Sequence, residues 1–162
     1  MTMQGFGTWL YETPVSTLIR DEGWIIPSVQ SIHILAIAVV IGSALVSDLR
    51  IAGILATDTM PNVVIRRYLR WMWTALVVLL LTGAVMAVGE PDRVLGNRTF
   101  WIKMLLVVVA CVITWLFRRP LLHPDFVLED AKWRSLVKPA AWLSLGLWIA
   151  VIFCGRWIAY TI

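Results

Sequence analysis

The chain has 162 residues, of which 60% are hydrophobic and 15% are charged, and its mean hydropathy is +0.82. A soluble domain carries about 25% charged residues, so the composition excludes an ordinary soluble protein. The formal net charge of +4 is modest, and no part of the sequence indicates a nucleic-acid partner.

The first element is an amphipathic segment over residues 1–24, which mixes apolar and charged side chains. It lacks the basic start, apolar stretch and small-residue cleavage site of a secretory signal. Thr13 and Pro14 form a typical helix start, because proline fits the first helical position. We expect this segment to lie on the membrane surface as a short interfacial helix.

Four apolar segments follow, each near the roughly 20 residues that a helix needs to cross a bilayer. They cover about residues 25–47, 71–89, 100–117 and 139–161. None alternates polar and apolar residues as a membrane barrel strand does, and in lipid a helix satisfies its own backbone. The sequence therefore predicts one all-α domain over residues 1–162, an integral membrane four-helix bundle.

The three connections differ in character. The first span is expected to continue as helix to about Leu55, before Asp58 and Pro61 end it, and Asp48 is expected to pair with Arg67 or Arg70. Residues 89–99 are rich in turn formers and predict a tight antiparallel pair of spans. Residues 118–138 predict a loop with a short surface helix.

The positive charges predict the orientation. An even number of spans places both termini on one side. The connections on the opposite side hold Arg50, Arg66, Arg67, Arg70, Arg118, Arg119, Lys132, Arg134 and Lys138, and the terminal side holds Arg20, Arg93, Arg98, Lys103 and Arg156. The positive-inside rule then predicts a bacterial inner-membrane protein with both termini in the periplasm. Several of the ten Trp residues lie near span ends, where this side chain anchors helices.

His33 is the strongest candidate for a functional residue, because it is the sole ionisable side chain between residues 25 and 46. Such a residue inside a span is costly and is a functional hypothesis by default. By helical periodicity, the polar residues of this span share one face, which we expect to point into the bundle. That face comprises Gln30, His33, Ile37, Val40, Ala44, Ser47 and Asp48.

The chemistry that best suits the periplasmic half of the bundle, where His33 is expected to lie, is haem b. A neutral imidazole is a common axial ligand of haem iron, and Met can be the second. The sequence predicts His33 as ligand, Met86 or water opposite it, and Lys103 and Arg156 near the propionates. A second histidine ligand within one chain is not expected, because His123 lies in a connection on the other side of the membrane.

Two alternatives stay open. In the first, the protein is a cofactor-free structural subunit and His33 forms a hydrogen bond between helices. In the second, it handles copper, for which His33, Met86, Met104 and Cys154 have suitable ligand atoms. Either cysteine is otherwise a packing residue. The expected partners are the lipid bilayer, a periplasmic or membrane redox partner, and further subunits or copies of the chain; whether it is an enzyme is undecided.

Three strings carry a resemblance to a family of uncharacterised bacterial four-helix membrane proteins: SIHILAIAVVIGSALVSDLRIAG, NRTFWIKMLL and GRWIAY. The matching positions are His33, Gly42, Asp48, Leu49, Arg50, Lys103, Gly155 and Arg156. The His in the first span and the FWIK opening of the third are more distantly similar to the haem-binding four-helix membrane protoporphyrinogen oxidase and to copper-resistance D-type proteins. These relatives imply His33 as a haem ligand and Lys103 as a pocket residue. Unlike the oxidase, this chain has Arg118 and Arg119, and no histidine, at the inner end of the third span.

Overall fold

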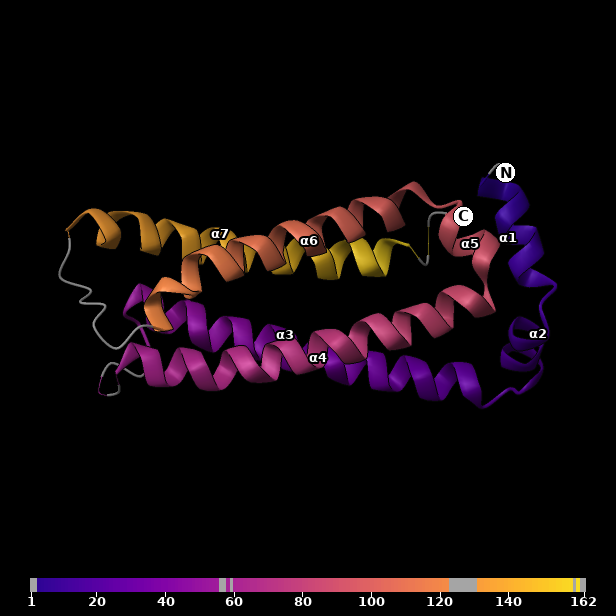
Figure 1. The fold of residues 1–162 in the computed structure, drawn as a ribbon, viewed down its shortest axis with the longest axis horizontal. Helices are drawn as coiled ribbons and strands as arrows, with labels where there is room; N and C mark the ends of the chain where they lie inside the picture. Colours follow the sequence, from indigo (N-terminus) through magenta and orange to yellow (C-terminus); the bar gives the residue numbers. More distant parts are fainter. Residues whose placement is uncertain (1–2, 56–57, 59, 123–130, 159, 161–162) are drawn as a thin grey trace.

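The computed structural model describes residues 3–55, 58, 60–122, 131–158 and 160, and these residues form helices without any strand. Four long helices run side by side, each antiparallel to the next along the chain (Figure 1). They are α3 (Ile25–Ala52), α4 (Pro61–Gly89), α6 (Arg98–Arg118) and α7 (Ala131–Trp157). The short helices α1 (Met3–Tyr11), α2 (Pro14–Asp21) and α5 (Pro91–Leu95) lie at the end where both termini are found, here called the terminal end. The opposite end, called the loop end, carries the 3₁₀ helix η1 (Pro120–Leu122).

All four long helices are long and apolar enough to cross a membrane, with mean hydropathies of 1.8 to 2.4 over their most apolar stretches. The predicted fold class, an all-α membrane bundle, is confirmed, and the chain is a multi-pass membrane protein. The helices extend past the predicted spans at the loop end. Thus α4 begins at Pro61, and α7 begins at Ala131 and continues through Pro139.

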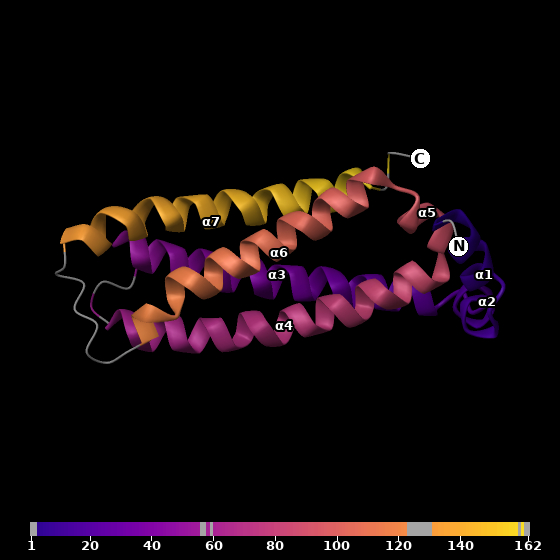
Figure 2. The ribbon, with the colours of Figure 1, turned by 45° about the horizontal axis from the view of Figure 1, so that its top comes forward.

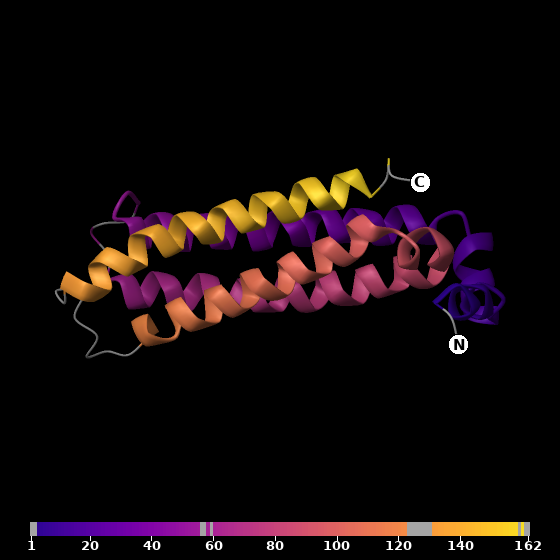
Figure 3. The same ribbon diagram turned by 90° about the horizontal axis from the view of Figure 1, so that it is seen from above.

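The bundle is built from two helix pairs, α3 with α4 and α6 with α7, which are joined mainly by contacts between α3 and α7. α6 is inclined to its neighbours, so that it approaches α4 at the loop end and α7 at the terminal end (Figures 2 and 3). A buried apolar cluster holds the four helices together between the two ends. It consists of Val40, Ala44, Met72, Ala75, Leu76, Ala110 and Trp148.

Local signals set the helix ends. The Thr13 side chain accepts a hydrogen bond from the Ser16 amide at 3.4 Å, and Pro14 takes the first helical position, so the predicted helix start is confirmed. α3 ends at Ala52, earlier than the predicted Leu55, because Gly53 adopts the left-handed conformation (φ 79°) that terminates helices.

Residues 3–24 contain two helices, α1 and α2, that lie across the terminal end of the bundle (Figure 2). α1 packs on α5, and α2 packs on α4. The contact of α2 with α4 is close, because a Cβ added to Gly89 of α4 would lie 3.0 Å from Cγ2 of Ile19 in α2. The same Cβ would lie 3.2 Å from Cδ1 of Ile26 at the start of α3. These two helices expose large apolar side chains, namely Phe6, Trp9, Tyr11, Val15 and Leu18. This arrangement supports the expected position at a membrane surface.

Candidate functional site

His33 turns toward α4, as the shared polar face of α3 predicts, whereas Gln30, nearer the start of α3 on the same predicted face, is exposed. Its Nδ1 lies 2.7 Å from Oγ1 of Thr82, and the ring is half-buried between the helices. The ring also covers Gly83, where an added Cβ would lie 3.6 Å from Cε1 of His33. The imidazole therefore faces protein on one side and is not surrounded by acyl chains.

The hydrogen bonds of Thr82 favour one tautomer of His33. The Thr82 hydroxyl lies 2.7 Å from the carbonyl oxygen of Val78 and 3.3 Å from that of Leu79, either of which can accept its single proton. With the proton donated there, Oγ1 accepts from Nδ1–H of His33, which satisfies both side chains. In the neutral ring Nε2 carries the lone pair, and no hydrogen bond within the described residues occupies it. Metal-binding histidines are commonly fixed in this way, by a hydrogen bond from the nitrogen that does not bind the metal.

Lys103 reaches the same region from α6. Its side chain packs over Gly155 of α7, where an added Cβ would lie 3.5 Å from Nζ. The ammonium is close enough to act electrostatically on His33 and on Cys154. In the described ranges it has neither a carboxylate nor a hydrogen-bond acceptor as partner. A cation inside a span is costly without an anionic or hydrogen-bonding partner, so this position favours an anion nearby.

The other predicted site residues make no described contact with His33. Met86 is half-buried on α4, one turn beyond Thr82 toward the terminal end. Arg156 is exposed, and its Nη2 donates to the Tyr160 hydroxyl at 2.8 Å while its guanidinium stacks over that ring. Cys111 and Cys154 are free thiols. No described contact brings Met86 or Arg156 to His33, and their roles stay predictions.

A second polar site lies at the loop end, about 22 Å from His33 along α3 at 1.5 Å per residue. Here Asp48 of α3 and Arg118 of α6 form a buried ion pair, with 2.7 Å between Oδ1 and Nη2 and both side chains 2% exposed. Nη1 of Arg118 also donates to Sδ of Met72 at 3.6 Å. The predicted pairing of Asp48 with Arg67 or Arg70 is wrong: those arginines are exposed on α4, whereas Arg118 enters the interior.

Several polar atoms around this ion pair are buried without a hydrogen-bond partner in the part of the chain that the structure describes. They are Asp48 Oδ2, Thr114 Oγ1, Ser144 Oγ and, further toward the centre, Trp148 Nε1. The Ser144 hydroxyl lies beside the Asp48 carboxylate but outside hydrogen-bond geometry. A cavity of about 10 Å³ is lined by Asp48, Thr114, Arg118 and Ser144 among apolar side chains. This is about the room that one water molecule needs, and the polar atoms supply the partners that it requires.

Sequence reasoning missed this second site. The charge distribution places Arg118 among the loop charges, although it is the last residue of α6 and is buried. Ser144 carries no signal in the sequence, because one serine in an apolar span is ordinary. Asp48 was the available signal, since a carboxylate near the end of a span requires a cation; the choice of cation depends on the inclination of α6. His123, which was expected in a solvated loop, lies outside the described residues.

Together these observations define a four-helix multi-pass membrane protein with an imidazole site toward the terminal end and a buried ion pair toward the loop end. Residues 19–161 match a family described as a family of unknown function, DUF6644, and the chain belongs to this family. No curated protein and no solved structure matches it. The family match agrees with the resemblance to an uncharacterised family, whereas the similarities to the oxidase and to copper-resistance proteins stay predictions.

Proposed function

We propose that this protein binds haem b toward the terminal end of the bundle, with Nε2 of His33 as an axial ligand, and that it transfers electrons within the membrane. The observation that carries the proposal is the His33–Thr82 hydrogen bond. It fixes the ring and leaves Nε2 free to bind a metal. Haem, when bound, supplies a one-electron redox centre.

The available ligand atoms favour haem over a bare metal ion. Haem brings four equatorial nitrogens and needs as few as one protein ligand, which His33 supplies. A bare ion depends on several protein side chains. Nowhere in the described part of the chain do three or more His, Cys, Asp or Glu side chains gather. The copper alternative, whose candidate ligands Met86 and Met104 are thioethers outside that group of side chains, stays a prediction.

The remaining residues have supporting roles in this proposal. Lys103 would compensate a propionate, because its ammonium acts electrostatically on His33 and has no carboxylate partner within the described ranges. Arg156 is a second candidate for a propionate near the membrane surface, and Met86 or water is the candidate for the other axial position. Thr82 is a positioning residue, since it orients the imidazole without touching the iron.

The proposed setting is the bacterial inner membrane with both termini in the periplasm, as the distribution of Lys and Arg predicts. The electron partner would be a periplasmic protein or a membrane carrier. The chain would act as a subunit or as a homo-oligomer, because a single haem near one surface does not connect the two sides of a bilayer.

The test is the visible spectrum of the full chain, expressed with a haem supply and purified in mild detergent. We expect a Soret band in the wild type, its loss in His33→Ala, and its retention in the control Gln30→Ala, which changes an exposed residue one turn away. Thermal unfolding of each variant shows whether the fold persists. A colourless wild type, or a Soret band that persists in a folded His33→Ala, contradicts the proposal.

The His33–Thr82 hydrogen bond also favours a second candidate, a cofactor-free structural subunit in which this bond only joins α3 to α4. In that case the purified wild type lacks a chromophore even with haem supplied. His33→Ala and Thr82→Val would then lower the unfolding temperature by similar amounts and have no spectral effect.

A further inference from the structure

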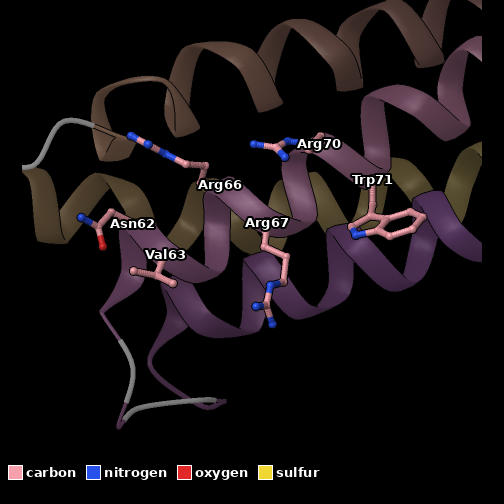
Figure 4. A pocket seen from close by; sticks show the side chains of 6 residues that line it. All are labelled: Asn62, Val63, Arg66, Arg67, Arg70 and Trp71. Atoms are coloured by element: carbon pink, nitrogen blue, oxygen red, sulfur yellow. The ribbon is translucent and has the colours of Figure 1, made fainter.

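A groove of about 570 Å³ lies on α4 near the loop end, far from His33. It is lined by Asn62, Val63, Arg66, Arg67, Arg70 and Trp71, which are the residues drawn in Figure 4. The three arginines are exposed, and none of them pairs with a carboxylate among the residues that the structure describes. Arg66 makes one long hydrogen bond of 3.5 Å to the carbonyl of Leu122. The groove therefore offers three cations with free hydrogen-bonding capacity.

The arginines surround the groove rather than point one way. Figure 4 shows Arg66 and Arg70 reaching to one side of α4 and Arg67 to the other, with the indole of Trp71 closing the end nearer the membrane centre. A guanidinium binds phosphate oxygens through two parallel hydrogen bonds, so this arrangement suits a phosphate group. The exposed Val63 and Trp71 add apolar surface beside it.

The depth of the groove matches the headgroup layer of a bilayer. α4 has 29 residues, so it is about 43 Å long, and the hydrocarbon core is only about 30 Å thick. The stretch from Trp71 to Gly89 carries no charge and accounts for about 28 Å of this length. The ten residues of α4 before Trp71, where all three arginines lie, are thus placed among headgroups, and Trp71 is at the interface that Trp prefers.

We propose that this groove binds the headgroup of an anionic phospholipid. Its phosphate would contact Arg66 and Arg70, which reach to the same side of α4, and Arg67 would add positive charge from the other side. Its acyl chains would follow the apolar surface of α4 beyond Trp71. A soluble phosphate would leave that apolar surface unused. A zwitterionic headgroup would carry a cation into a site that already holds three. This binding site is independent of the proposed haem site at the other end of the bundle.

The experiment measures thermal unfolding of the full chain in mild detergent with added phosphatidylglycerol, phosphatidylcholine, inorganic phosphate or polyglutamate. We expect phosphatidylglycerol to raise the unfolding temperature saturably, and the other additions to have little effect. Arg67→Gln/Arg70→Gln removes two groove charges and leaves the Arg66 hydrogen bond. It should weaken the phosphatidylglycerol effect about tenfold or more in apparent affinity, since each basic residue contributes substantially to binding anionic lipid.

The control is Arg119→Gln/Lys138→Gln, which removes the same charge from exposed positions toward the same end but outside the groove. Its apparent affinity for phosphatidylglycerol should stay within about twofold of the wild-type value, as expected if the groove residues dominate lipid binding. Equal stabilisation by phosphatidylcholine, or an equal loss in the control, overturns a specific anionic-lipid site. An equal effect of phosphate identifies a soluble anion as the ligand, and an equal effect of polyglutamate identifies an acidic protein segment; either result overturns the proposal.

Discussion

Replacing Asp48 by Asn should destabilise the bundle far more than the loss of one surface charge. The substitution keeps the shape of the side chain but leaves the Arg118 guanidinium buried without a counter-charge, in a pair whose side chains are 2% exposed. Removing one partner of a buried ion pair costs about 3–5 kcal/mol. At about 2–4 °C per kcal/mol for a chain of this size, the unfolding temperature should fall by about 6–20 °C.

Thermal unfolding in detergent, followed by circular dichroism, measures this effect, and the chain supplies its own control. Glu90 and Arg93 form an exposed pair at 3.0 Å, with side chains 49% and 43% exposed. Glu90→Gln should cost less than about 1 kcal/mol, because water screens exposed charges.

A second variant tests the physical cause. Adding Arg118→Met to Asp48→Asn removes the stranded cation, and replacing buried ion pairs by apolar side chains is often neutral or stabilising. The double variant should therefore recover at least half of the lost stability. The reasoning is refuted if Asp48→Asn costs no more than Glu90→Gln, or if Arg118→Met deepens the loss.

Three further changes probe the contacts around the two sites. Thr82→Val should lower stability by about 1–3 kcal/mol, because it leaves a buried imidazole N–H without an acceptor; an unchanged thermal transition would argue against the hydrogen bond. Ser144→Ala should leave stability unchanged or raise it slightly, since the Ser144 hydroxyl has no hydrogen-bond partner among the described residues; a loss above about 1 kcal/mol would show that a water molecule in the adjacent cavity binds the hydroxyl. Gly89→Leu should displace α2 from α4 and speed proteolysis between α2 and α3. The control Gly146→Leu, which adds its side chain in open space, should not; equal cleavage of the two variants would contradict the close packing of α2.

The fold and the site follow from the sequence to different degrees. The bundle is predictable, because uncharged apolar stretches of this length have few folds open to them in lipid. The inward direction of His33 is predictable too, since the polar residues of α3 share one face. Both features depend only on the order of residues within a single helix.

The partners of the polar residues are not predictable in this way. Thr82 becomes the acceptor for His33 because α4 packs beside α3. Arg118 meets Asp48 of α3 because the inclination of α6 brings its loop end toward the α3–α4 pair. Charge counting assigned Arg118 to a loop, since an arginine beside the end of a span usually reaches water. Its burial depends on how the helices cross, which periodicity does not encode.

The proposed haem site depends on the protonation of one ring, in which His33 donates from Nδ1 to Thr82 and keeps Nε2 free. The most direct measurement is ¹⁵N NMR of the histidine side chains in haem-free protein labelled only at histidine. The chain has just two histidines, so His123→Gln identifies the His33 signals. We predict a proton on Nδ1 and a bare Nε2, with loss of this preference in Thr82→Val. A proton on Nε2 in the wild type would contradict the account, because the nitrogen proposed to bind iron would then not be free.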